Sequence, residues 1–278
     1  MQQRSSSSRG MSGAEWLFVL LLVVVVLSLL IPRINSTPQF APNVKQKAQL
    51  RSIDTALELL SNEWGDYPPS DANDDVGQAY CGAMKLAEAI MGQDLLGFHV
   101  ASGFRADGFD PNGGTILYGT GTLSARRGPY LQPENANAYR LADIYGEGNT
   151  GPFPGDLRVM CDVYTRKRPS GKKTGMPILY YRADPNGMLH DVNDPDNPAN
   201  IYHWRDNQAL VELGVPGEPS GRHPLADPHR FYLNTQSDKT SESQPFRGDS
   251  YILLSAGEDG LYGTADDICN FDWSYRKR

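Results

Sequence analysis

The chain has 278 residues, enough for a hydrophobic segment and one substantial globular domain. Its formal net charge of −7 argues against a nucleic-acid-binding surface, and we expect no nucleic-acid partner. Glycine (28 residues) and proline (20 residues) exceed their average shares, so we expect many loops.

The first 32 residues combine a short basic leader with an apolar run. Arg4 and Arg9 stand in a Ser-rich segment, and residues 16–31 are apolar apart from Ser28. Glu15 stands at the head of the run, where an ionisable group in a membrane costs several kcal/mol and needs a function. We predict a leader over 1–10, a transmembrane or assembly helix over 11–32, an amphipathic continuation over 33–64 and an exported domain over 65–278.

Two other interpretations of this segment remain open. A cleaved signal peptide needs a small-x-small site, and the stretch after Leu30 offers no good one. A plain signal anchor needs about 20 apolar residues, a length that the run from Met11 to Ile31 nearly reaches. Met11 is also an alternative to Met1 as the first residue translated.

The next segment predicts an amphipathic helix. Apolar residues recur at spacings of three and four from about Val44 to Trp64. Pro38 and Pro42 are expected to interrupt any continuous helix upstream, and Gly65 stands in a suitable position to end this one.

Beyond residue 65 the chain reads as short elements separated by turns. We expect a helix over about Gly82–Gln93 and polar loops over 184–199 and 215–249. The predicted fold is α+β, with the long N-terminal helix packed on a small antiparallel sheet. The strand candidates are Thr115–Tyr118, Leu157–Tyr164, Pro177–Arg182 and Ser250–Ser255.

Several motifs together resemble a known family. Gly10, Met11, Glu15 and Pro32 are placed as in the type IV prepilin signal. Four later motifs follow in an order similar to that of the major pseudopilin, the G-type subunit, of type II secretion. They are G-D-Y-P (65–68), G-P-Y-L (128–131), G-M-P-I-L-Y-Y (175–181) and S-A-G-E-D-G-L-Y-G-T-A-D-D-I (255–268), separated by large insertions at about 72–125 and 184–249.

The resemblance implies a type IV pilin-like fold and a structural, non-enzymatic role in protein export. A prepilin peptidase would cleave after Gly10 and methylate the new terminus at Met11. Subunits would then assemble into a homopolymer on an inner-membrane secretion platform, with the Glu15 carboxylate neutralising a neighbour's terminal amine. The protein would cross the inner membrane once, with Arg4 and Arg9 holding the N-terminus in the cytoplasm and the C-terminal domain exported.

The last motif also predicts a calcium site. A single stretch of ten residues in a glycine-rich loop contains four carboxylates, and such hard oxygen ligands suit structural Ca²⁺. By resemblance the ligands would be the Asp259, Asp266 and Asp267 carboxylates and the Ala256 carbonyl, with Glu258 a poorer candidate. A solvated acidic turn is the alternative.

The remaining chemistry-bearing residues form no catalytic motif. The five histidines are scattered, so we predict surface or packing roles and no enzymatic activity. Cys81, Cys161 and Cys269 allow one disulfide in an oxidising compartment, and the pairing stays open. The alternative functions are a membrane-anchored exported ligand-binding protein and a tethered hydrolase. The secreted cargo, the role of the insertions and the choice between a major and a minor pseudopilin also stay open.

Overall fold

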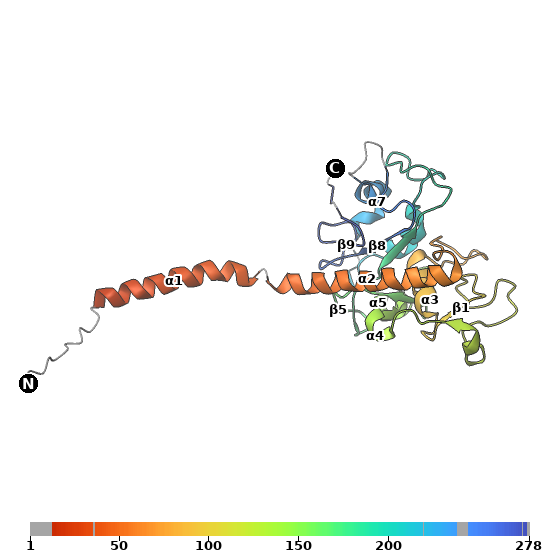
Figure 1. The fold of residues 1–278 in the computed structure, drawn as a ribbon, viewed down its shortest axis with the longest axis horizontal. Helices are drawn as coiled ribbons and strands as arrows, with labels where there is room; N and C mark the ends of the chain where they lie inside the picture. The colour runs from red at the N-terminus through yellow and green to blue at the C-terminus, as the bar shows by residue number, and fades with distance from the viewer. Residues whose placement is uncertain (1–12, 36, 219, 238–243, 274, 277–278) are drawn as a thin grey trace, which may run out of the picture. The chain divides into compact units, whose positions relative to one another are not determined.

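The computed structural model describes residues 13–35, 37–218, 220–237, 244–273 and 275–276. The chain divides into two units, Met1–Pro42 and Asn43–Arg278, each with its own internal contacts (Figure 1).

The first unit contains α1 (Gly13–Asn35) and the start of α2 (Thr37–Trp64). Among the residues that the structure describes, no helix is both long and apolar enough to cross a membrane. The apolar run over 16–31 extends about 24 Å as a helix, short of a hydrocarbon core of about 30 Å, and charged Glu15 and Arg33 flank it closely. The predicted membrane helix over 11–32 is therefore wrong, and so is the single-pass inner-membrane location that depended on it.

The second unit begins with the rest of α2, which ends at Trp64 as predicted. The helix starts earlier than expected and continues through Pro42. Pro38 lies in its first turn, where a missing N–H costs little, and Pro42 removes only one further backbone hydrogen bond. The prediction that Pro42 interrupts the helix is therefore wrong, whereas Pro38 stands at the start of α2, a helix separate from α1.

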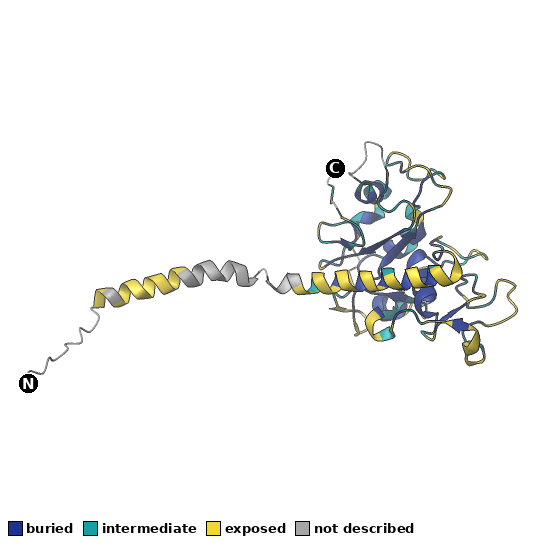
Figure 2. Cartoon of the chain, in the orientation of Figure 1, coloured by how far each residue is buried: buried dark blue, intermediate teal, exposed yellow. Residues whose placement is uncertain are grey.

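One face of α2 packs into the domain. Figure 2 shows the helix exposed along one side and buried along the other. Leu50, Ile53, Leu57 and Leu60 are fully buried, at the spacing of three and four that defines one helical face. Gln49 lies on the same side and donates a hydrogen bond to the Cys161 carbonyl at 2.9 Å. The predicted amphipathic pattern over 44–64 is confirmed.

A three-stranded antiparallel sheet in the order β7-β8-β9 forms the centre of the domain. Its strands are β7 (Leu179–Arg182), β8 (Tyr251–Ser255) and β9 (Ile268–Cys269). Alternate residues of a strand point to opposite faces, so Tyr180 and Leu253 join the α2 cluster while Tyr181 and Ile252 join the core on the other side. The predicted strands at 177–182 and 250–255 are confirmed.

The helix expected over Gly82–Gln93 is α3 (Gly82–Met91), and all ten of its residues are buried. Three two-stranded antiparallel pairs surround the central sheet: β1 with β2, β3 with β4, and β5 with β6. Their bounds are Phe98–His99, Arg126–Arg127, Ala138–Arg140, Arg158–Met160, Arg166–Lys167 and Lys173–Thr174.

Short helices complete the domain. The mixture of helices and small antiparallel sheets fits the predicted α+β class only in part, because the described residues include no membrane helix. Residues 115–118 form no strand and contribute only an isolated bridge between Phe109 and Ile116. The helices are η1 (Thr120–Ala125), α4 (Pro133–Ala136), α5 (Leu141–Tyr145), η2 (Trp204–Asn207), α6 (Gln208–Val211), η3 (Pro224–Ala226) and α7 (Pro228–Thr235). Two of them, η3 and α7, lie in the 215–249 segment predicted as loop.

Candidate functional site: the C-terminal acidic loop

The predicted metal loop joins the adjacent strands β8 and β9, and the pairing of Ser255 with Ile268 closes its base. Gly257 has a positive φ of 65°, and a Cβ placed there would lie 2.4 Å from the Asp266 carbonyl oxygen. Only glycine allows this backbone approach. The loop is thus held in a tight conformation by its glycines.

Three of the predicted ligands converge on one side of the loop. Asp266 accepts hydrogen bonds from the Asp259 backbone N–H at 2.9 Å and from the Thr264 hydroxyl at 2.6 Å. Asp267 accepts from the backbone N–H groups of Gly263 at 2.7 Å and Thr264 at 3.2 Å. Asp259 accepts from the Leu261 N–H at 2.7 Å. The structure therefore brings Asp259, Asp266 and Asp267 together around Thr264.

The carboxylates differ in their electrostatics. Burial raises the pKa of Asp267 to about 8, against the opposing effect of its hydrogen bonds. Burial, followed among other causes by repulsion from Asp266, also raises the pKa of Asp259. Burial would raise the pKa of Asp266 too, but hydrogen bonds from Thr264 and Asp259 outweigh it and lower that pKa. A bound cation would favour the ionised form of all three groups.

The residues fit calcium in their chemistry but not in their present arrangement. In the described parts of the chain, no group of three acidic, histidine or cysteine side chains is placed to hold a metal ion. Both oxygens of Asp266 and both oxygens of Asp267 already accept loop hydrogen bonds, although Asp259 and Asp266 are only half-buried. Ala256 is fully buried beside them. The Arg166 guanidinium donates to the Glu258 carbonyl and so places a positive charge beside the loop.

Asp162 is a buried carboxylate beside this loop that the sequence analysis missed. It is fully buried, and it accepts from the Ser255 hydroxyl at 3.1 Å and the Met176 N–H at 3.1 Å. Burial raises its pKa to about 7. The available signal was a single acidic residue within the predicted strand over 157–164.

A second unpredicted polar cluster surrounds Glu88 of α3. Its carboxylate accepts hydrogen bonds from the hydroxyls of Tyr80 at 2.5 Å and Tyr118 at 2.7 Å, from the Ser102 hydroxyl, and from the Gln93 amide at 3.2 Å. Burial raises the pKa of Glu88, although these hydrogen bonds oppose the shift. Its donors come from four different segments, so the cluster ties separate parts of the 72–125 insertion to α3.

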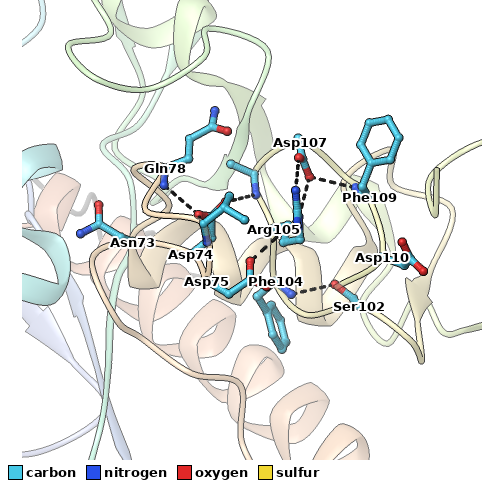
Figure 3. Close-up of polar contacts among 12 residues, drawn as sticks. Asn73, Asp74, Asp75, Gln78, Ser102, Phe104, Arg105, Asp107, Phe109 and Asp110 are labelled. Carbon is cyan, nitrogen blue, oxygen red and sulfur yellow. Dashed lines mark hydrogen bonds and ion pairs between the residues drawn. The ribbon is translucent and has the colours of Figure 1, made fainter. Parts of the chain in front are cut away.

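The same insertion is organised around an aspartate and an arginine. Figure 3 shows Asp74 accepting hydrogen bonds from backbone N–H groups, including that of Gln78 at 2.8 Å. Arg105 pairs with Asp107 at 2.6 Å and approaches Asp75 at 3.9 Å (Figure 3). These bonds close turns and balance charge within the insertion.

The predicted assembly and processing residues are described less fully. Glu15 and Pro32 lie within α1, and the structure leaves their side chains undescribed. Gly10 and Met11 lie outside the described residues.

The three thiols and two of the histidines lie inside the domain and outside the acidic loop. Cys81, Cys161 and Cys269 are all free, and burial raises the pKa of each thiol. His190 and His223 are buried, and His190 Nε2 lies 2.8 Å from the Tyr232 carbonyl.

Comparison of the chain with protein-family models, with curated proteins and with solved structures finds no match. The resemblance to pseudopilins therefore rests on the sequence motifs alone.

Proposed function

We propose that this chain is a structural subunit that assembles through α1 into a pseudopilus-like homopolymer supporting protein export, after processing by a prepilin peptidase. The observation that carries the proposal is the surface of α1. From Trp16 to Val24 every residue is large and apolar, and each is 43–73% exposed.

An apolar helix surface of this kind favours association. A helix that is apolar all round is normally buried on every side, and one partner covers only part of it. Because the run over 16–31 is shorter than a bilayer core, we assign its cover to the α1 helices of other copies, several per helix, as in a filament. Glu15 at its head would pair with the terminal amine of a neighbour, since an isolated charge in such a bundle is costly.

Processing and assembly test this proposal in cells that contain a prepilin peptidase. The mature chain should begin at an N-methylated Met11 by mass spectrometry and form filaments visible by electron microscopy. Glu15→Gln should be cleaved normally but lose at least about tenfold in filament yield, because the amine loses its counter-charge. The exposed Glu147 provides a matched control, and Glu147→Gln should assemble like the wild type. A full-length, monomeric wild-type protein would contradict the proposal.

We also propose that Ca²⁺ stabilises the C-terminal loop of this subunit, through the Asp259 and Asp266 carboxylates and the Ala256 carbonyl, with Asp267 ordering the loop beneath them. Such an ion would supply only charge balance and rigidity. The half-buried position of Asp259 and Asp266 supports these roles, because repulsion from Asp266 raises the pKa of Asp259 and a cation would relieve that repulsion.

Thermal unfolding with and without calcium tests the site. At 100 times its Kd, Ca²⁺ should add about 2.7 kcal/mol, or about 5–10 °C in Tm for a domain of this size. Asp266→Asn should lose most of this gain, while Asp272→Asn, at an exposed aspartate outside the loop, should keep it. Equal Tm values in EDTA and in Ca²⁺ would show that the loop is only an acidic turn.

A further inference from the structure

The hairpin formed by β5 and β6 carries positive charge that the fold does not neutralise. Lys167 and Lys173 are exposed and stand directly opposite each other in its pairing. Like charges in such opposed positions destabilise a hairpin. Neither lysine forms an ion pair with a carboxylate among the described residues, whereas the neighbouring Lys172 pairs with Asp143 at 2.8 Å. The hairpin thus presents two unpaired positive charges on a chain whose net charge is −7.

The start of α2 in the second unit adds to this positive surface. The Val163 N–H donates to the Gln46 side chain at 2.9 Å, and β5 begins shortly after Val163, so the hairpin lies beside this part of the helix (Figure 1). The basic residues here are exposed, and none of them pairs with a carboxylate in the part of the chain that the structure describes. We call the combined surface the basic end. It consists of Lys45, Lys47, Arg51, Lys167 and Lys173.

The charges along α2 do not stabilise the helix itself. Lys47 and Arg51 stand four residues apart, and like charges at that spacing destabilise a helix. Asp54 and Glu58 repeat this spacing with negative charge. Glu63 lies in the last turn, which has no basic residue, so its charge opposes the helix dipole. Basic residues thus gather toward one end and acidic residues toward the other at a cost to helix stability, which indicates a role in binding.

Acidic side chains cover the end of α2 and the segment that follows it. Glu63, Asp71 and Asp75 are exposed, and we call them the acidic end. Their ion pairs within the chain are long, at 3.8 Å for Asp71 and 3.9 Å for Asp75. Along α2, Lys47 and Glu63 are about 24 Å apart, more than twice the screening length of about 10 Å in 0.1 M salt. The two ends therefore cannot neutralise each other within one copy.

A second copy of this chain is the partner that these two surfaces select. Because each copy has a net charge of −7, two copies repel in most orientations, whereas the basic end of one attracts the acidic end of the other. An anionic polymer would use the basic end but would leave the acidic end without a role. A contact between two different surfaces leaves one of each free, so further copies can add.

We propose that the basic end of one copy binds the acidic end of the next copy, so that the second units join head to tail. As part of the homopolymer this contact rests on the proposed function, although it uses no residue of α1 itself. Self-association of the second units can therefore be measured apart from filament assembly.

Sedimentation of the purified full chain in a nonionic detergent tests the contact, because the detergent covers the apolar surface of α1 without screening charge. In about 0.1 M NaCl the wild type should self-associate with a Kd below about 1 mM, and in about 1 M NaCl the Kd should rise at least about tenfold. Lys167→Glu combined with Lys173→Glu should also raise it at least about tenfold. Glu63→Lys combined with Asp75→Lys should have the same effect. The chain with all four substitutions keeps the wild-type net charge and should associate again.

Carbodiimide crosslinking of the wild type locates the contact without relying on any variant. The reagent joins a lysine amine to a carboxylate that touches it. By mass spectrometry, covalent dimers should contain peptides in which Lys167 or Lys173 is joined to a carboxylate of the acidic end. Dimers crosslinked only at other residues would contradict the proposed contact.

Other results would also overturn it. One is a wild type that stays monomeric at about 1 mM in about 0.1 M NaCl. Another is association that neither pair of reversals changes, while thermal unfolding shows that the variants are folded. Binding of polyphosphate to the basic end without self-association would identify a surface for anionic polymers in its place. Filaments in cells without self-association in detergent would contradict this contact alone, whereas self-association without filaments would contradict the proposed function alone.

Discussion

Glu88→Ala should lower the free energy of unfolding by about 3–5 kcal/mol, the largest effect that we expect from a single side chain. The Tyr80, Tyr118 and Ser102 hydroxyls all donate to this carboxylate inside the core. Its removal leaves those donors without their acceptor at about 1–3 kcal/mol each, and it also leaves a cavity. Equilibrium unfolding in urea measures the loss, provided that the m-value stays constant.

Two further variants separate the network from simple packing. Tyr118→Phe removes one donor and should cost about 1 kcal/mol, while Glu88→Gln keeps an acceptor and the side-chain volume and should cost less than alanine. A loss below about 1 kcal/mol for Glu88→Ala would mean that the cluster contributes little to stability.

Local sequence patterns predicted those helices and strands in which the spacing of apolar residues alone determines which face is buried. The apolar spacing over 44–64 and the β-rich runs at 177–182 and 250–255 correspond to α2, β7 and β8. The prediction of a membrane helix over 11–32 was wrong, because it counted residues from Met11 and so included the charged Glu15 in the length of the apolar run. The start of α2 was also misplaced, because a helix tolerates proline in its first turn.

The polar side chains of α3 show what local patterns miss. Lys85 and Glu88 are charged and stand three residues apart, a spacing typical of the solvent face of a helix, yet both are buried. Lys85 Nζ donates to the carbonyls of Asp71 and Asn73, which belong to the preceding segment. These two side chains are buried by segments outside α3, and helical periodicity carries no information about such contacts.

The acidic loop shows the same contrast between residues that the sequence predicted and residues that it did not. Asp259, Asp266 and Asp267 were identified because they are close in sequence. The parts of its surroundings that come from elsewhere in the chain, including Asp162 and Arg166, were not. The 215–249 segment is another of these parts, since the Leu225 N–H donates to the Tyr262 carbonyl at 3.0 Å. A segment predicted as a polar loop therefore packs against the candidate site.

The pKa of Asp162 predicts how stability depends on pH. An aspartate titrates near 3.8 in the unfolded chain, whereas burial raises the pKa of Asp162 to about 7 in the folded protein. Below pH 4 both states are protonated, so the group has no effect. Between pH 4 and 7 the unfolded chain loses the proton and the folded protein keeps it, so stability falls as pH rises. The full shift corresponds to about 4 kcal/mol.

Asp162→Asn isolates this effect because asparagine has no proton to lose and keeps an oxygen acceptor for the Met176 N–H. In EDTA, its free energy of unfolding should match that of the wild type near pH 4. It should exceed the wild-type value by up to about 4 kcal/mol at pH 8. Asp272→Asn, at an exposed position, should show no such divergence. If the wild type and Asp162→Asn keep a constant difference from pH 4 to 8, then Asp162 ionises in the folded protein as readily as in the unfolded chain. In that case the contacts with Ser255 and Met176 must offset the full cost of burying its charge.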